Sequence, residues 1–206
     1  MSYTETQTTQ AQTTQTRFNG FNTTPETAAI PAPQQATQQR EALDPFQLRY
    51  ETPRRLPREL REEAMGMSWS LFTATYAPTP TVKFSDITAT RENWCYTTYA
   101  ADVTRTSKTF PPQTEHREVT ASGPAHAFSA MLAEEDRYVE ILEFHQFEIF
   151  EAKFTAIKVA HQINERNTAW AVGFGTTSEI SIASAMASGA QRIYCLLYTS
   201  PSPRDA

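Results

Sequence analysis

The chain of 206 residues is poor in the features that mark several classes of protein. Its two cysteines, Cys95 and Cys195, lie far apart and have no partners at metal-ligand spacing, so neither a disulfide framework nor a zinc site is indicated. No apolar run approaches the roughly 20 residues that a membrane span needs, and no basic-then-apolar signal pattern opens the sequence. We therefore expect a cytoplasmic protein in a reducing compartment, without a membrane partner.

Positive charge is also scarce, with 18 lysines and arginines against 23 aspartates and glutamates and a net charge of −5. Five arginines do gather between residues 49 and 61, but glutamates are interleaved with them. Such mixing is typical of a solvated helix face rather than of a phosphate-binding surface. No nucleic-acid partner is expected.

Catalytic motifs are missing as well. The four histidines show neither HxH nor HExxH spacing, and Gly173-Phe174-Gly175 is not followed by the third glycine of a dinucleotide fingerprint. Glu140 and Glu143 flank strand residues, where solvation is the simpler interpretation. His145 has two interpretations, a strand histidine hydrogen-bonded at a domain edge or a residue lining a ligand site. The sequence therefore predicts no catalytic residue and no metal or other cofactor in this chain.

The first 80 residues divide into two parts. Residues 1–43 are dominated by threonine and glutamine with few large apolar groups, a composition that predicts a disordered tail. Residues 44–80 predict a short helical subdomain, with one helix starting near Pro57 and a second from Ser68 to Tyr76. Two such short helices have no core of their own and must pack on another part of the molecule.

Residues 82–194 predict an α+β domain of two βββα units, antiparallel sheets with helices packed on one side. In the first unit, three strands between residues 82 and 121 precede a helix that Ser122 caps, with one apolar stripe of Phe128, Met131 and Leu132. In the second, three strand-like runs precede a final helix. One run is 139–146, and another, 169–175, alternates as in a half-buried strand.

The final helix has the clearest pattern in the chain. Thr176 and Glu179 have capping-box spacing. The apolar stripe that follows repeats at helical spacing and comprises Ile182, Ala185, Met186, Gly189, Ala190 and Ile193. Several members of the stripe are small, so this helix can approach a sheet or a twin helix closely.

One segment favours binding rather than catalysis. At Ser122-Gly123-Pro124 a helix starts at a glycine, so a ligand can approach the free N–H groups of the first turn. Such a helix start suits a carboxylate, for example that of an amino acid. An ordinary capped helix without a ligand explains the same residues.

The order of these elements resembles the C-terminal regulatory domain of 2-isopropylmalate synthase, the acyltransferase that commits carbon to leucine. The segments that carry the resemblance are the Gly-Pro helix start at 122–127, the strand 139–146 with its aromatic-His pair Phe144-His145, the tryptophan-glycine strand 170–174, and the last helix. Residues 56–60 and 71–76 are similar to the second helical subdomain of the actinobacterial type. The likeness covers roughly residues 54 to 194.

The resemblance implies a domain that dimerises and binds leucine as a feedback inhibitor. It implies a homodimer with a small amino-acid effector, bound by Ser122, Gly123, Pro124, Ala125, Phe144 and His145. The metal-binding His-x-His pair and the Arg-Asp-Gly motif of the family's catalytic barrel are not in this sequence, so the divalent metal belongs to the barrel. Acetyl transfer to 2-oxoisovalerate is therefore not expected of this chain alone. Where relatives have a loop of Gly and Ala, residues 147–152 are bulky and acidic.

Two alternatives stay open beside this interpretation. The chain is a fragment or paralogue of the synthase, whose activity lies in a barrel not present here, or it is a dimerisation or partner-binding module without a ligand. Residues 195–206 fit neither the domain nor a helix extension, and we expect them to be a non-native tail that resembles translated adapter sequence.

Overall fold

The structure is a computed structural model that describes residues 44–164 and 166–199, with side chains as far as Cys195. The predicted disordered tail at 1–43 and residues 200–206 lie outside the described residues. The described helices include none that is long and apolar enough to cross a membrane.

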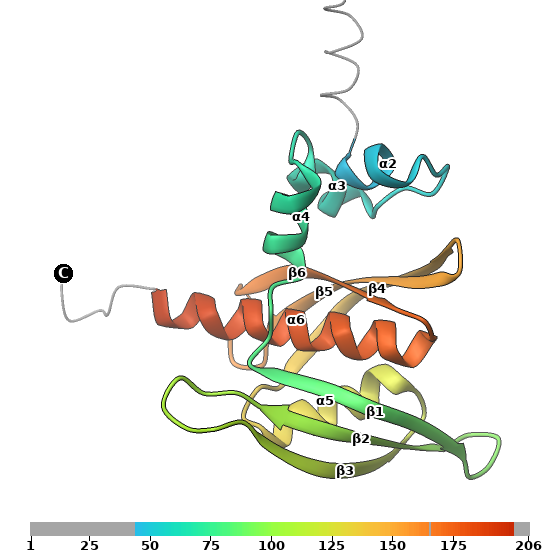
Figure 1. The fold of residues 1–206 in the computed structure, drawn as a ribbon, viewed down its shortest axis with the longest axis vertical. Coiled ribbons are helices and arrows are strands. Elements are labelled where there is room, and N and C mark those ends of the chain that lie inside the picture. The colour runs from blue at the N-terminus through green and yellow to red at the C-terminus, as the bar shows by residue number, and fades with distance from the viewer. Residues whose placement is uncertain (1–43, 165, 200–206) are drawn as a thin grey trace, which may run out of the picture.

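The described chain forms two three-stranded antiparallel sheets, each followed by a helix (Figure 1). The first unit consists of β1 (Val82–Arg91), β2 (Thr97–Arg105), β3 (Gln113–Ala121) and α5 (Pro124–Glu134). The second consists of β4 (Val139–Ile149), β5 (Ala152–His161), β6 (Thr168–Gly175) and α6 (Ser178–Thr199). Three short helices precede them, namely α2 (Pro45–Tyr50), α3 (Arg58–Ala64) and α4 (Trp69–Tyr76). The predicted pair of βββα units is confirmed.

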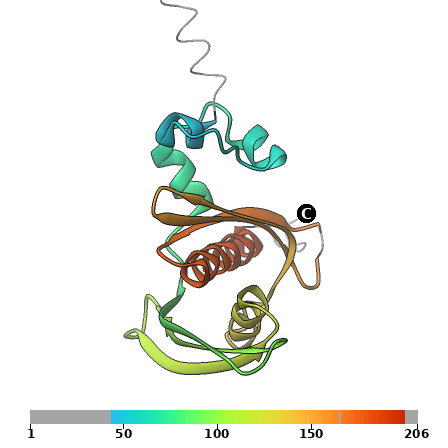
Figure 2. The same ribbon diagram turned by 90° about the vertical axis from the view of Figure 1, so that its right-hand side faces the viewer.

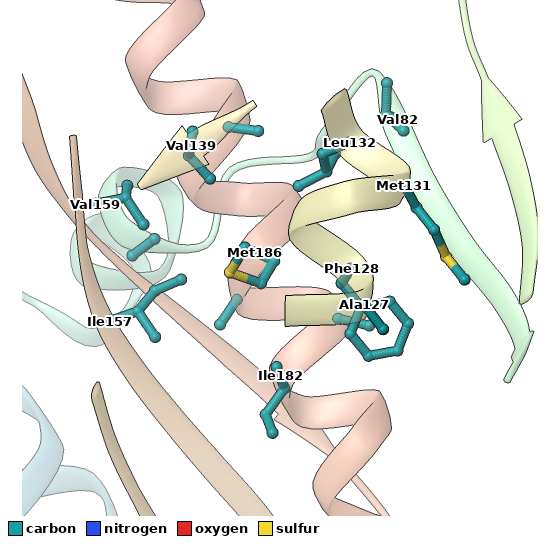
Figure 3. Close-up of a cluster of buried hydrophobic side chains, with 14 of the residues drawn as sticks. Val82, Ala127, Phe128, Met131, Leu132, Val139, Ile157, Val159, Ile182 and Met186 are labelled. Carbon is teal, nitrogen blue, oxygen red and sulfur yellow. The ribbon is translucent and has the colours of Figure 1, made fainter. Parts of the chain in front are cut away.

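The two helices α5 and α6 lie side by side between the two sheets, as Figure 2 shows. The apolar stripes of both helices and the inner faces of both sheets form one buried cluster (Figure 3). Every stripe residue predicted from helical spacing is buried in it, including Phe128, Met131, Met186 and Ile193. Each unit therefore buries the apolar face of its sheet against its own helix and the helix of the other unit.

The two units match in strand register, which makes their positions comparable. Val82 pairs with Arg105 at one end of the first sheet, as Val139 pairs with His161 in the second. In both units a bulge interrupts the pairing of the first two strands. At the other end, the last strand stops three residues before the first residue of the helix in each unit.

The outer face of the second sheet is covered by α2, α3 and α4, while none of the described helices covers the outer face of the first sheet (Figure 2). A second apolar cluster forms on the outer face of the second sheet. It includes Phe46 of α2, Leu60 of α3, Phe72 of α4, and Phe154 and Trp170 of the sheet itself. The two predicted helices thus pack on another part of the molecule, as expected. Helix α2 was not predicted, although Asp44 followed by proline is a helix-start signal. The Asp44 carboxylate accepts from the N–H of Gln47 at 2.6 Å.

Three predicted details are wrong. Strand β6 is buried on both faces, not half-buried, because α6 covers one face and the helical subdomain the other. Helix α6 continues to Thr199 and does not end at Tyr194, since residues 195–199 contain neither glycine nor proline to interrupt it. Residues 147–149 belong to β4, which leaves only Phe150 and Glu151 as the turn before β5.

Candidate functional site

Helix α5 begins without a side-chain cap. Its N-cap residue is Gly123, not Ser122 as predicted, and no side chain bonds to the first turn. The N–H of Ala127 donates to the Gly123 carbonyl at 3.2 Å, but the N–H groups of Ala125 and His126 have no acceptor among the described residues. A Cβ atom at Gly123 would meet nothing within 4 Å, so the space beside this helix start is open. The site therefore offers two donors and room for an acceptor.

Helix α6, in contrast, is capped by Thr177. Its hydroxyl oxygen accepts from the N–H of Ile180 at 3.3 Å, and its carbonyl accepts from the N–H of Ser181 at 3.1 Å. The cap therefore lies one residue after the predicted Thr176, and Glu179 is not part of a capping box. The cap thus satisfies the N–H groups of Ile180 and Ser181, while those of Ser178 and Glu179 have no acceptor among the described residues.

Four side chains close the space beside the start of α6, and we call Gln146, Thr155, Ser178 and Ser181 the polar plug. The Ser178 hydroxyl donates to the Gln146 amide oxygen at 2.8 Å, and the Gln146 amide nitrogen donates to Thr155 at 2.9 Å. Thr155 is hydrogen-bonded to Ser181, whose hydroxyl donates to the Gly173 carbonyl at 3.4 Å. Thr155 and Ser181 are fully buried, and each has a partner.

At the start of α5 the described residues form no such network. The pair Ala89 and Tyr99 has the register position that Gln146 and Thr155 have in the second unit, and Ala127 corresponds to Ser181. Tyr99 is only 6% exposed, and its hydroxyl makes no hydrogen bond with any described residue. The two halves of the molecule therefore differ chemically at the same place, with the helix start filled by polar side chains in one and left open in the other.

The other two predicted site residues lie on opposite faces of the second sheet. Phe144 pairs with Ile157, whose side chain is in the inner cluster, so Phe144 faces the helices and is 43% exposed. The His145 ring lies 6.2 Å from the ring of Trp170 and its Nε2 lies 3.6 Å from Glu143 on the outer face. His145 is thus separated by the sheet from the start of α5 and cannot act with it on one ligand. It fits the interpretation of a strand histidine at a domain edge.

A second feature is a groove along α6 between the two sheets, on the side of β1 and β6. It has a volume of about 300 Å³ and is lined by Pro80, Lys83, Phe84, Phe174, Ile180, Ala183, Ser184 and Ala187. Strand β6 is an edge strand and carries no charged residue, whereas β1, on the other side of the groove, has charged residues and a bulge. Charges and bulges protect sheet edges from pairing with other chains, so the edge of β6 is the less protected of the two.

Within the part of the chain that the structure describes, no three or more histidine, cysteine, aspartate and glutamate side chains lie close enough to hold a metal ion. Both cysteines are exposed and free.

A scan of the sequence against protein-family models found no match, and a search of the curated proteins found no similar sequence.

Proposed function

We propose that this chain is a regulatory module that binds a small amino-acid carboxylate of the leucine type at the start of α5 and forms a homodimer. The observation that carries the proposal is the contrast between the two helix starts. Helix α6 has a side-chain cap and the polar plug beside it, while α5 has no side-chain cap, has open space at Gly123, and leaves the N–H groups of Ala125 and His126 without acceptors among the described residues. The resemblance to the regulatory domain of 2-isopropylmalate synthase supports the same assignment.

The chemistry of the α5 site suits a carboxylate with an aliphatic side chain. Free N–H groups and the positive end of the helix dipole attract the carboxylate. Apolar side chains lie next to the first turns of the helix, where the Phe128 ring is 5.1 Å from that of Phe84 and 6.3 Å from that of Tyr99. An effector with one charged end and one apolar end therefore finds both environments at this place.

The dimer is supported by the groove along α6 and by the unprotected edge of β6. A second copy placed there would cover Phe174 and Ile180 of the groove and hydrogen-bond with the free edge. Three of the four residues that line the groove from α6, Ala183, Ser184 and Ala187, are small, so a partner can approach this helix closely. This surface also supports the alternative of a dimerisation module that has no ligand.

Thermal unfolding with leucine, isoleucine and valine tests the ligand. Binding to the folded state alone raises the free energy of unfolding by about 2.7 kcal/mol at a hundredfold excess over Kd. Gly123→Val should abolish the shift, because the new side chain fills the open space beside the free N–H groups. Thr120→Val, a control on the exposed outer face of β3, should keep it.

The backbone at Gly123 has φ −171°, which other residues adopt readily, so the valine variant is expected to fold. If millimolar concentrations of all three amino acids leave the unfolding curve of the wild type unmoved, the ligand assignment fails. A dimer in sedimentation equilibrium without any ligand effect would then favour the dimerisation module. A monomer at all concentrations contradicts the dimer.

A fragment or paralogue of the synthase would share this regulatory fold, so activity is tested separately. We expect no release of coenzyme A from acetyl-CoA and 2-oxoisovalerate with this chain alone, because its sequence has neither the His-x-His pair nor the Arg-Asp-Gly motif of the family's barrel. Release above a buffer control with purified protein would contradict this.

A further inference from the structure

The tip of the hairpin between β1 and β2 presents a tryptophan to solvent. The Trp94 side chain is 86% exposed and belongs to neither apolar cluster of the described residues. The turn itself is tied together without it. The Asn93 side-chain oxygen accepts from the N–H groups of Cys95 at 2.8 Å and Tyr96 at 2.9 Å. The Tyr96 carbonyl accepts from the N–H groups of Glu92 at 3.1 Å and Asn93 at 3.2 Å. A preformed turn thus holds out a large apolar side chain, which lowers the cost of burying it against a partner.

The groove along α6 is the concave counterpart of this tip. Phe84, Phe174 and Ile180 line it, and its floor contains Ala183 and Ala187. The two alanines are 2% and 4% exposed, while Ile180 is still 38% exposed. The small residues of the floor leave room above α6, and the larger ones supply apolar surface that a partner can cover.

One strand connects the two features. Lys83 and Phe84, near the start of β1, line the groove, and the hairpin tip follows Arg91 at the other end of the strand (Figure 1). At a rise of about 3.3 Å per strand residue, Asn93 lies about 30 Å from Lys83. The tip of one copy therefore cannot fill its own groove, and only a second copy brings the two together.

The charges at the two places are complementary. Lys83 lies at the groove and Glu92 at the tip, and neither has an ion-pair partner among the described residues. A two-fold axis across the middle of β1 sets the strands of two copies antiparallel, so that Lys83 of each copy comes opposite the partner's Glu92. Counted along the strand in the same way, Trp94 comes opposite the partner's Thr81, next to Pro80 of the groove.

We infer that the homodimer forms by exchange of hairpin tips, with Trp94 of each copy in the groove of the other and Lys83 paired with the partner's Glu92. A central aromatic side chain in an apolar pocket, with charges at the rim, is the arrangement of an interface hot spot. The bulge in β1 disfavours continuous strand pairing between the copies, so the contact is concentrated at the two ends of the strand. This inference rests on the homodimer proposed above and names the segment that fills its groove.

Sedimentation equilibrium of the full chain tests the anchor. Trp94→Ala should raise the dimer Kd at least about tenfold, because it removes the side chain that fills the groove. Phe110→Ala is the matched control. It removes another exposed aromatic side chain, 69% exposed, from the loop between β2 and β3, and should leave the Kd unchanged. An unchanged Kd in Trp94→Ala would overturn the inference and leave the homodimer standing, whereas a wild type that is monomeric at all concentrations would overturn both.

A charge exchange tests the orientation of the two copies. Lys83→Glu and Glu92→Lys should each weaken the dimer about threefold or more, since each sets like charges opposite one another. The double variant restores opposite charges and should return the Kd to within about twofold of the wild type. A double variant that is weaker than either single one would show that Lys83 does not meet the partner's Glu92.

Tryptophan fluorescence reports on Trp94 directly. Dilution of the wild type from dimer to monomer should shift the emission to longer wavelength, because Trp94 returns from the groove to water. Trp69 and Trp170 pack in the outer apolar cluster and should not contribute. Trp94→Phe keeps an aromatic anchor and should still dimerise, but without the shift. A wild-type dimer that dissociates with no change in emission, or a shift that persists in Trp94→Phe, would overturn the inference.

Discussion

The guanidinium carbon of Arg192 lies 4.8 Å from the centre of the Tyr76 ring, although one residue belongs to α6 and the other to α4. Arg192 also donates to the Trp170 carbonyl, and the Tyr76 hydroxyl donates to Glu63 at 3.2 Å. Burial lowers the pKa of Arg192 below its usual value. Burial, and then the charge of Glu63, raises the pKa of Tyr76 to about 12. This contact fastens the helical subdomain to the second unit.

Arg192→Ala should therefore loosen the helical subdomain. It removes a cation–π contact and a hydrogen bond to a buried carbonyl, and we expect the free energy of unfolding to fall by about 2–3 kcal/mol. Arg58→Ala, which removes an exposed ion pair with Glu62, should change it by less than about 0.5 kcal/mol. Urea unfolding measures both. If the two variants lower the free energy of unfolding equally, the contacts of Arg192 do not stabilise the packing of the helical subdomain on the second unit.

Gly173 within β6 and Gly123 at the start of α5 should differ in how strongly alanine destabilises the protein. A Cβ at Gly173 would lie 2.3 Å from the backbone of Ala185 and of Ser181, so Gly173→Ala should force α6 away from β6 and destabilise by about 3 kcal/mol or more. Gly123→Ala meets open space and should cost less than about 1 kcal/mol as a weaker N-cap. Thermal unfolding of the two variants compares them directly. A stable Gly173→Ala protein would contradict the close approach of α6 and β6.

The buried hydroxyl pair of the polar plug should be energetically coupled. Thr155→Val removes a partner of both Ser181 and Gln146 and should cost about 1–2 kcal/mol. Adding Ser181→Ala should cost less in this background than in the wild type, because the hydroxyl has already lost a partner. A double-mutant cycle measures the difference, which we expect to be about 0.5–1.5 kcal/mol. Additive effects would mean that the two hydroxyls do not stabilise each other.

His116 should make the stability of the first unit depend on pH. The hydrogen bond with Asp102 at 2.8 Å raises the pKa of this exposed imidazole above its usual value, and Glu118 at 3.6 Å adds to the effect. Because the folded pKa is raised, the stabilisation is fully present below the unfolded pKa and is lost as the pH rises through the folded one. An NMR titration should find the His116 pKa lowered in Asp102→Asn. That variant should be destabilised at pH 5 more than at pH 9, and the reverse order would contradict the ion pair.

Much of the fold was predictable because the signals are local. The spacing of Phe128 and Met131, and of Ile182 and Met186, predicts which helix faces are buried, and the structure confirms it. The helix starts were each misplaced by one residue, at Ser122 and Thr176. The N-cap is the last residue whose backbone is not yet helical. Neighbouring residues with similar side chains are equally good candidates for that position in the sequence.

A cluster of charged side chains near the end of α5 was not predicted, for a different reason. Arg105, Arg117 and Glu135 come from two strands and a turn, with no spacing in the sequence that connects them. Only strand pairing and the position of α5 bring them together. The placement of Phe144 and His145 on opposite faces of the sheet could have been predicted from the sequence, since neighbouring residues of a strand face opposite sides of a sheet.

Two βββα units with buried helix stripes could be predicted from the sequence, because period-two and period-3.6 patterns act within a single element. The chemistry of the helix starts and of the charged cluster depends on tertiary contacts. Only the folded chain shows that α6 begins beside a network of polar side chains while α5 has no side-chain cap, and that Arg117 meets Glu135 where the second unit has Ala171 and Gly189. Those differences depend on which side chains from distant segments meet, and a pattern within one segment holds no information about its partners.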